Sequence, residues 1–385
     1  MTAALETPVP GQDDALHLLQ ESAHRVLAAA CPLQALSAGG EDVAAIAWRH
    51  WRLATEMGWP GLMIPEAAGG AGMDCRALAV LAEAMGAQFF CGPFLATAVL
   101  GAAVADLAAR HGRMTGLARA IAAGQVVLAG ASVAPPREPA GAPAELRIEL
   151  GAEARLSGAR ELVEHVALAT HFLVFETVRR SDATIELLAA PVPAGAGVQI
   201  TPRQALDVTC PIASVRLERA AVPAEDVLAT RLTAAALDAL LRPVHVAIAA
   251  ELVGVAQSAL DRAVAHAKER RQFGQPIGRF QAIKHRLADA FVLVANARLA
   301  VRHAARVEDD PAAVGSARVL AAEAALKAAG DYIQVQGGMG ISWESDAHLH
   351  LKRARRLAAT FGSSQGFRQV IADRFIASVL AAGNA

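Results

Sequence analysis

The spacing of hydrophobic residues changes twice along the chain. From about residue 13 to 125, apolar side chains recur every three or four positions, which places them on one face of a helix. Between about 126 and 228, short runs of strand-forming residues such as VVLAGASV and HFLVFETV alternate with glycine and proline. Helical spacing returns in long segments from about 233 to the end.

This order predicts an α+β fold that is mostly α. We expect an N-terminal all-helical domain over 1–125, a middle β-domain over 126–230 and a C-terminal helical bundle over 231–385. Because no long helical segment interrupts the middle runs, an antiparallel β-domain is expected rather than a parallel α/β sheet. The stretch EMGWPGLMIPEAAGGAGMD (56–74) breaks the first pattern with prolines and glycines, which predicts a shaped loop between helices.

The composition narrows the class of protein. A formal net charge of −1 over 385 residues argues against bulk attraction to nucleic acid or to an anionic membrane. The longest uncharged window, 84–105, is interrupted by glycine and proline, so no membrane span is expected. The first residues lack a signal-peptide pattern, and four scattered cysteines without metal-binding spacing indicate reduced thiols. We therefore expect a cytoplasmic protein without a metal site.

Two segments carry candidate binding chemistry. RRQFGQPIGRFQAIKHRLADA (270–290) concentrates cationic side chains, and a planar guanidinium makes bidentate contacts to phosphate oxygens. A solvated helix end is the alternative for this segment. In QVQGGMG (334–340), paired glycines allow a backbone to approach a ligand closely, although a helix C-cap explains such a turn equally well. This turn is no GxGxxG after a strand, so a Rossmann nicotinamide site is not supported.

With these segments the chain resembles the acyl-CoA dehydrogenase family, FAD-dependent flavoproteins with the same three-part layout. The resemblance spans nearly the whole length. It rests on five stretches in the family's order: MGWPGLMIPEAAGGAGMD, LSGARELVEHVALATHFLV, AAVPAEDVLA, AIAAELVGVAQSALDRAVAHAKERRQFGQPIGRFQAIKHRLAD and IQVQGGMGISWESDAHLHLKRA.

The resemblance implies an FAD site shared between subunits. The family's diphosphate arginine falls on Arg270 and the phenylalanine near its adenine end falls on Phe273. The other matching positions are Gln281, Gln334, Gly337 and Gly338. A shared cofactor implies a homo-oligomer or a heterotetramer with a related chain. The implied substrate is an acyl-CoA, and the implied electron acceptor is an electron-transfer flavoprotein.

The family's reaction is the α,β-dehydrogenation of an acyl-CoA to a 2-enoyl-CoA. A glutamate base removes the Cα proton while hydride passes from Cβ to flavin N5. Counting from LKR, that glutamate's position falls on Gly362, which is followed by Ser363 and Ser364; we count Ser364 among the cofactor-side residues. The catalytic base is therefore not identified.

Three other side chains are candidate substitutes for the base. A minority of the family carries its glutamate on the long helix beside a substrate-binding arginine, and these two positions fall here on Val244 and His245. His245 can in principle act as a base, but a packed core histidine is the alternative. Glu251 lies two turns further along the same face, as a base or as a structural partner.

The flavin-side β motif is also altered. Leu162 and Glu164 stand where relatives carry an aromatic residue and a threonine beside the flavin ring, and APPREPAGAPAE (134–145) replaces the family's usual loop. Glu164 is thus either a relocated base or an exposed strand carboxylate.

These residues leave two main hypotheses. The first is an FAD-dependent acyl-CoA dehydrogenase with an unconventional or partner-supplied base. The second is a non-catalytic subunit that completes the FAD site of a related catalytic chain in a hetero-oligomer. A flavin-free structural homologue is a third interpretation.

Overall fold

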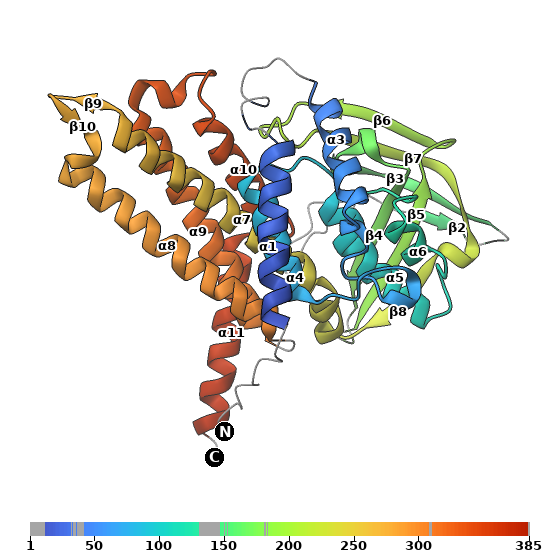
Figure 1. The fold of residues 1–385 in the computed structure, drawn as a ribbon. Helices are drawn as coiled ribbons and strands as arrows, with labels where there is room; N and C mark the ends of the chain where they lie inside the picture. The colour runs from blue at the N-terminus through green and yellow to red at the C-terminus, as the bar shows by residue number, and fades with distance from the viewer. Residues whose placement is uncertain are drawn as a thin grey trace.

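The structure is a computed structural model that describes residues 12–31, 33, 36, 42–130, 147–149, 151, 153–180, 182, 184–307 and 310–383. Helices of the N-terminal part lie between a C-terminal helical bundle and a middle β-domain (Figure 1). The α+β fold, mostly α, with this three-part order is the one that the hydrophobic spacing predicts.

The N-terminal part is helical. Its helices are α1 (Gln12–Ala30), α3 (Val43–Glu56), α4 (Cys75–Ala87), α5 (Ala102–Arg110) and α6 (Leu117–Ala122), and a π-helical turn, η3 (Leu95–Gly101), leads into α5. Aspartates start two of these helices, because an Asp side chain accepts hydrogen bonds from the free amides of the first turn. Asp42 accepts from the Ala44 amide at 3.0 Å, and Asp74 accepts from the Arg76 amide at 2.9 Å.

Two four-stranded sheets form the middle domain, in the strand orders β1-β4-β5-β8 and β2-β3-β7-β6. The strands are β1 (Leu128–Gly130), β2 (Arg147–Glu149), β3 (Glu153–Glu164), β4 (His171–Arg179), β5 (Ile185–Pro193), β6 (Val198–Arg203), β7 (Ile212–Pro223) and β8 (Leu228–Leu232). Alternate side chains of β4 and β7 are buried between the sheets, for example Phe172, Val174, Val215 and Leu217.

One strand pair departs from the expected antiparallel arrangement. Strand β1 pairs in parallel with β4, with Leu128 opposite His171, whereas the other described pairs of the two sheets are antiparallel. The chain between β1 and β4 passes through β2 and β3 of the other sheet, and such a long crossover permits a parallel return. Strand β1 is also tied to the helices, since Thr97 Oγ1 accepts from the Leu128 amide at 2.9 Å.

The C-terminal part is a helical bundle. Its helices are α7 (Ala234–Glu269), α8 (Gln281–Arg306), α9 (Pro311–Gln336), α10 (Ala347–Ala359) and α11 (Ser364–Gly383). The spacing did not predict the small hairpin of β9 (Arg271–Gln272) and β10 (Gln275–Pro276) between α7 and α8. Figure 1 shows this hairpin at the end of the bundle farthest from the middle domain.

Helix α7 is the central element of the core. Within the described part of the chain it alone has the length and apolar composition to cross a bilayer, but 67% of its apolar window is buried inside the protein, as in a core helix. Two glycines let α7 touch α4 backbone to backbone. A Cβ at Gly254 would lie 2.0 Å from the Glu83 carbonyl, and one at Gly86 would lie 2.1 Å from the Glu251 carbonyl. This close contact between the two backbones holds Glu251 of α7 directly against α4 of the N-terminal part.

Candidate functional site

A cleft of about 440 Å³ lies where the N-terminal helices, the middle domain and α10 meet. Clefts at domain boundaries are the usual places for small-molecule sites. Apolar side chains of η3 and Phe361, which follows α10, line one side of the cleft. Polar side chains of β3, of the loop 204–210 and of α10 line the other side. The lining includes Leu95, Leu100, Leu162, Glu164, His165, Gln204, Asp207, Arg355, Arg356 and Phe361.

Arg356 joins the two sides of this cleft. Its Nε donates to Asp207 Oδ2 at 2.8 Å, and its Nη1 donates to Glu164 Oε1 at 2.9 Å. Asp207 is only 2% exposed, so this pairing keeps two carboxylates of the middle domain compensated by one guanidinium of the bundle. Buried charges need such partners.

Arg353, one helical turn before Arg356, closes the inner end of the cleft. Its guanidinium is 4% exposed and donates to Glu251 Oε1 at 2.6 Å and to the Phe90 carbonyl at 2.6 Å. It also lies over the ring of Phe89, with 5.1 Å between the guanidinium carbon and the ring centroid. The five charged groups of Arg353, Arg356, Glu164, Asp207 and Glu251 form one cluster, which we call the cleft ion cluster.

Protonation in the cleft follows from this cluster. Burial, the largest single influence, raises the pKa of the Glu164 and Asp207 carboxyls, but the charge of Arg356 together with neighbouring charges and hydrogen-bond donors outweighs it, so both pKa values fall below their ordinary values. Burial lowers the pKa of His165 to about 4. At neutral pH the cleft therefore holds ionised carboxylates beside a neutral imidazole.

The position expected for the family's base has no side chain and an unusual backbone. Gly362 has φ 116°, in a region that L-residues rarely adopt, and Phe361 before it has φ 57°. The buried Arg318 holds this turn from α9, donating to the Thr360 carbonyl at 2.7 Å and to the Gly362 carbonyl at 3.4 Å. Ser364, the first residue of α11, is half-buried behind the turn.

His245 does not face the cleft. It lines a separate pocket of about 310 Å³ between α7, α9 and α11, where its ring meets Phe367 edge-on with centroids 5.1 Å apart. Burial, followed by the Arg318 charge, lowers the pKa of His245 to about 3. These surroundings match the alternative of a packed histidine more closely than a base.

Glu251 and Glu164 differ in their access to the cleft. Glu251 lines a small inner pocket and is paired with Arg353. Glu164 lines the main cleft, and the neighbouring Leu162 projects there at 58% exposure with φ 57°. The altered loop 134–145 lies outside the described residues.

The remaining predicted residues gather at the far end of the bundle. Arg270 caps α7, Phe273 is 89% exposed in the β9–β10 hairpin, and Gln281 begins α8. The last turn of α9, with Gln334, and the glycines that follow it, Gly337 and Gly338, lie nearby. Packing of Val335 against Ala267 and Ile277 holds the end of α9 beside the segment between α7 and α8. A Cβ at either glycine would meet no atom within 4 Å, so this backbone is open to a ligand.

The donor chemistry of this end fits an anionic nucleotide. Among the described residues, the Arg270 guanidinium is exposed and has no carboxylate at ion-pair distance, and open glycine backbone lies beside it. The cleft is lined by η3, β3, the 204–212 segment and the last turn of α10, whereas Arg270, Phe273 and Gly337 lie in and beside the β9–β10 hairpin, so the structure describes them as two separate groups. The family resemblance predicts that residues of both groups contact one FAD shared between two chains.

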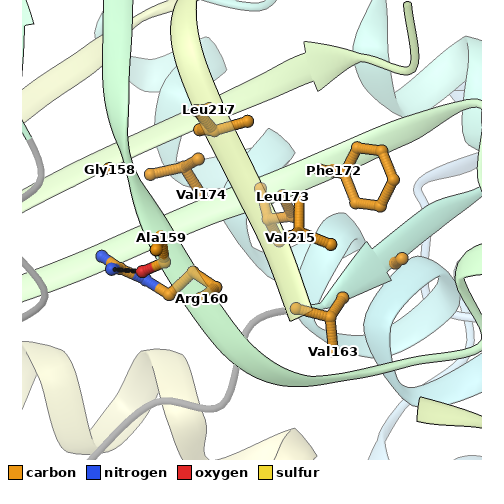
Figure 2. A pocket seen from close by; sticks show the side chains of 10 residues that line it. Gly158, Ala159, Arg160, Val163, Phe172, Leu173, Val174, Val215 and Leu217 are labelled. Carbon is orange, nitrogen blue, oxygen red and sulfur yellow. Dashed lines mark hydrogen bonds between the residues drawn. The ribbon is translucent and has the colours of Figure 1, made fainter. Parts of the chain in front are cut away.

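A second cavity, inside the middle domain, is too small for a substrate. Figure 2 shows it between β3, β4 and β7, with Val163, Phe172 and Val215 turned into it and Arg160 at its edge. Its volume is about 20 Å³, room for about one water molecule. Among the described residues, no group of three His, Cys, Asp or Glu side chains is placed to hold a metal ion.

Sequence reasoning missed Arg353, Arg356 and Asp207. The two arginines lie three residues apart in RARR, a spacing that places them on one helical face, and this was a usable signal. Asp207 accepts a hydrogen bond from the amide of Thr209, two residues later, at 3.0 Å. This local turn is typical of aspartate. Nothing in the sequence indicated that these segments meet.

Comparison with known proteins agrees with this architecture. Residues 234–376 match the family model described as Acyl-CoA dehydrogenase, C-terminal domain, and residues 13–115 match the Acyl-CoA dehydrogenase, N-terminal domain. The chain is 32% identical over 345 residues, 88% of its length, to Acyl-CoA dehydrogenase FadE34 of Mycobacterium tuberculosis. Over 107 residues, 28% of its length, it is 48% identical to Acyl-CoA dehydrogenase IpdE2 of the same species.

The lengths of these relatives differ from that of the chain. The matches cover 44% of FadE34 and 33% of IpdE2, so the chain spans less than half of either relative.

The solved structure of a variant of the Tcur3481-Tcur3483 steroid ACAD superposes with a TM-score of 0.77 at 26% identity, covering 96% of this chain and 99% of that chain. With both family models matched in the expected order, the chain belongs to the acyl-CoA dehydrogenase family, whose members are FAD-dependent.

Proposed function

We propose that this chain is an FAD-dependent acyl-CoA dehydrogenase that converts an acyl-CoA thioester to its 2-enoyl-CoA. The observation that carries the proposal is the 440 Å³ cleft between the domains, which holds an ionised carboxylate, Glu164, at its wall. Bound FAD would supply the acceptor for the hydride that leaves Cβ. The remaining chemistry is the removal of one proton from Cα and the positioning of the thioester.

Glu164 is the group of this chain that we assign to the proton. Arg356 donates to Oε1, and the Cys210 thiol also donates to this carboxylate, which lines the cleft wall. The guanidinium keeps Glu164 ionised at neutral pH but also weakens it as a base. The exposed Leu162 beside it covers the cleft wall and helps to exclude water.

The bundle end serves the cofactor of a neighbouring chain in this proposal. Arg270 contacts the diphosphate, Phe273 lies near the adenine, and the open turn at Gly337 and Gly338 approaches the ADP part. Gln281 and Gln334 supply amide contacts there, while Leu162, Glu164 and Ser364 belong to the flavin side. The assembly is a homo-oligomer or a heterotetramer with a related chain.

Replacing Glu164 with glutamine tests the assignment of the base. Loss of a positioned general base lowers turnover by about 10²–10⁴-fold. Glu161→Gln is the matched control, because Glu161 is exposed on the same strand outside the cleft. Equal turnover of the two variants at equal FAD content would remove Glu164 from the mechanism.

A second candidate function is favoured by one observation. Among the described residues lining the cleft and its inner pocket, all three carboxylates, those of Glu164, Asp207 and Glu251, are paired with arginine. A chain without a free base suits a non-catalytic subunit that completes the FAD site of a related catalytic chain. Such a subunit increases FAD retention by its partner, and Glu164→Gln leaves the turnover of the complex unchanged.

The setting of the protein is also proposed. An electron-transfer flavoprotein is the expected acceptor of the two electrons, and the cytoplasm is the expected location. The four cysteines, Cys31, Cys75, Cys91 and Cys210, are buried and form no disulfide, which suits a reducing compartment. We place the domain boundaries near residues 125 and 230.

A further inference from the structure

The cleft continues into a small inner pocket of about 30 Å³. The two spaces share the lining residues Gly92, Leu95, Glu164, His165 and Arg356. Beyond these residues the inner pocket is walled by apolar side chains of α4 and α7, such as Ala82, Met85 and Ala247. A hydrocarbon chain that entered the cleft would find its deepest apolar surroundings there.

A buried ion pair stands in this inner pocket. Arg353 and Glu251 both line it, and their side chains are joined by two contacts, at 2.6 and 3.0 Å between guanidinium nitrogens and Oε1. The Phe90 carbonyl holds the same guanidinium at 2.6 Å. Because these contacts come from α10, α7 and the end of α4, the pair cannot swing aside without leaving buried polar groups unpaired.

We propose that the Arg353–Glu251 pair is the floor of the acyl site and determines its substrate specificity. The pair leaves the outer cleft, about 440 Å³, to the flavin side and a short or broad acyl group together, and it excludes long straight chains, whose methylenes would have to displace a buried ion pair. This inference rests on the proposed function, since it assumes that the cleft receives the acyl group.

Removal of both charges together is the appropriate perturbation. One arginine without its carboxylate, or the reverse, leaves an uncompensated buried charge, whereas replacing both by apolar residues is often tolerated. Arg356 keeps Glu164 and Asp207 as partners, so the rest of the cleft ion cluster has the same net charge after the pair is lost. The test variant is therefore Arg353→Met with Glu251→Ala, which removes the pair and opens the inner pocket.

The control carries the same chemical change outside the cleft. Arg298 donates to Glu83 at 2.8 Å, and both side chains are largely buried but line neither the cleft nor its inner pocket. Arg298→Met with Glu83→Ala thus removes a partly buried ion pair, whose side chains are 24% and 14% exposed against 4% and 18% for the pair of Arg353 and Glu251. Calorimetric titration of butyryl-, octanoyl- and hexadecanoyl-CoA into each oligomeric protein gives the three Kd values.

The chain-length series distinguishes the possible results. For the wild type and the control, we expect the octanoyl-CoA Kd to lie within about threefold of the butyryl-CoA Kd. In the test variant each newly buried methylene tightens binding by up to about fourfold, so octanoyl-CoA binds at least tenfold more tightly than butyryl-CoA. If the wild type already binds longer acyl chains progressively more tightly, the pair of Arg353 and Glu251 does not limit chain length. This measurement uses the wild type alone, so it is valid even if the test variant fails to fold.

The remaining outcomes separate this inference from the proposed function. A folded test variant with the wild-type series would overturn the specificity role and leave the dehydrogenase proposal standing. Absence of binding for every acyl-CoA, butyryl-CoA included, would contradict the proposed function and the floor with it.

Discussion

Replacing Arg356 with methionine removes the guanidinium that connects α10 to the middle domain. Asp207 and Glu164 then lose contacts at 2.8 and 2.9 Å, and both carboxylates remain inside the cleft. Asp207 keeps the hydrogen bonds from the Thr209 amide and hydroxyl. The variant therefore measures how much the charge contact between α10 and the middle domain contributes to the free energy of unfolding, apart from the hydrophobic packing around it.

The expected loss is large because buried carboxylates are left without a cation. Removing one partner of a buried pair costs about 3–5 kcal/mol, whereas an exposed pair contributes under about 1 kcal/mol. We therefore expect Arg356→Met to lower the free energy of unfolding by about 3 kcal/mol or more. Adding Glu164→Gln and Asp207→Asn restores most of the loss, since no unpaired charge remains in the triple variant.

The dependence on pH follows from the lowered pKa values of Glu164 and Asp207. Each carboxylate stabilises the fold above its ordinary, unfolded-state pKa near 4, and this stabilisation is lost as the pH falls through the lower folded-state pKa. Without Arg356 that contribution is absent, so the difference between variant and wild type is largest at neutral pH and shrinks below about pH 4.

Urea unfolding followed by circular dichroism at several pH values measures these differences. Arg368→Met is the control, because the Arg368–Glu323 pair is about half exposed on the surface of the bundle. The reasoning fails if Arg356→Met is no worse than the control at neutral pH. It also fails if the triple variant is as unstable as the single one.

Three further predictions concern the cofactor and the base. Because Gly362 has φ 116°, Gly362→Glu and Gly362→Ala are both expected to lower the free energy of unfolding by about 1–3 kcal/mol. Higher turnover of the glutamate variant would show instead that the turn can change its backbone and accept a catalytic base. Arg270→Ala should reduce FAD retention more than Arg271→Ala, because Arg271 Nη2 instead donates to the Gly274 carbonyl within the hairpin at 3.0 Å; equal FAD stoichiometry would reject the diphosphate assignment. Sedimentation at micromolar concentration should give an oligomer, because we propose that the residues at the bundle end contact the FAD of a neighbouring chain; a stable monomer would argue strongly against the shared site.

Local signals predicted most of the fold. The change from helical to strand spacing and back predicted the order of helical, β and helical parts, since burial of one face imposes that spacing wherever an element packs. The parallel pairing of β1 escaped prediction because it depends on a crossover through the other sheet, and no local pattern records it. The β9–β10 hairpin has only two residues in each strand, too few to show any alternation.

The site was predictable only where single segments carry it. The missing glutamate at Gly362 could be read from the sequence, but the left-handed backbone there could not. Glu164 was identified as unusual, yet its partner Arg356 is 192 residues away along the chain. Arg353 and Glu251 are 102 residues apart, and only packing of α10 against α7 brings them together.

The measurement that tests the account most directly is anaerobic addition of butyryl-CoA to the purified oligomer, followed through the visible absorbance of its flavin. The protein is prepared alone and after co-expression with a related chain. An acyl-CoA dehydrogenase retains FAD, and the flavin band bleaches when substrate is added, quickly in the wild type and at least 10²-fold more slowly in Glu164→Gln. A band that persists unbleached in both preparations, or a protein that carries no flavin in either, would contradict the proposed dehydrogenation.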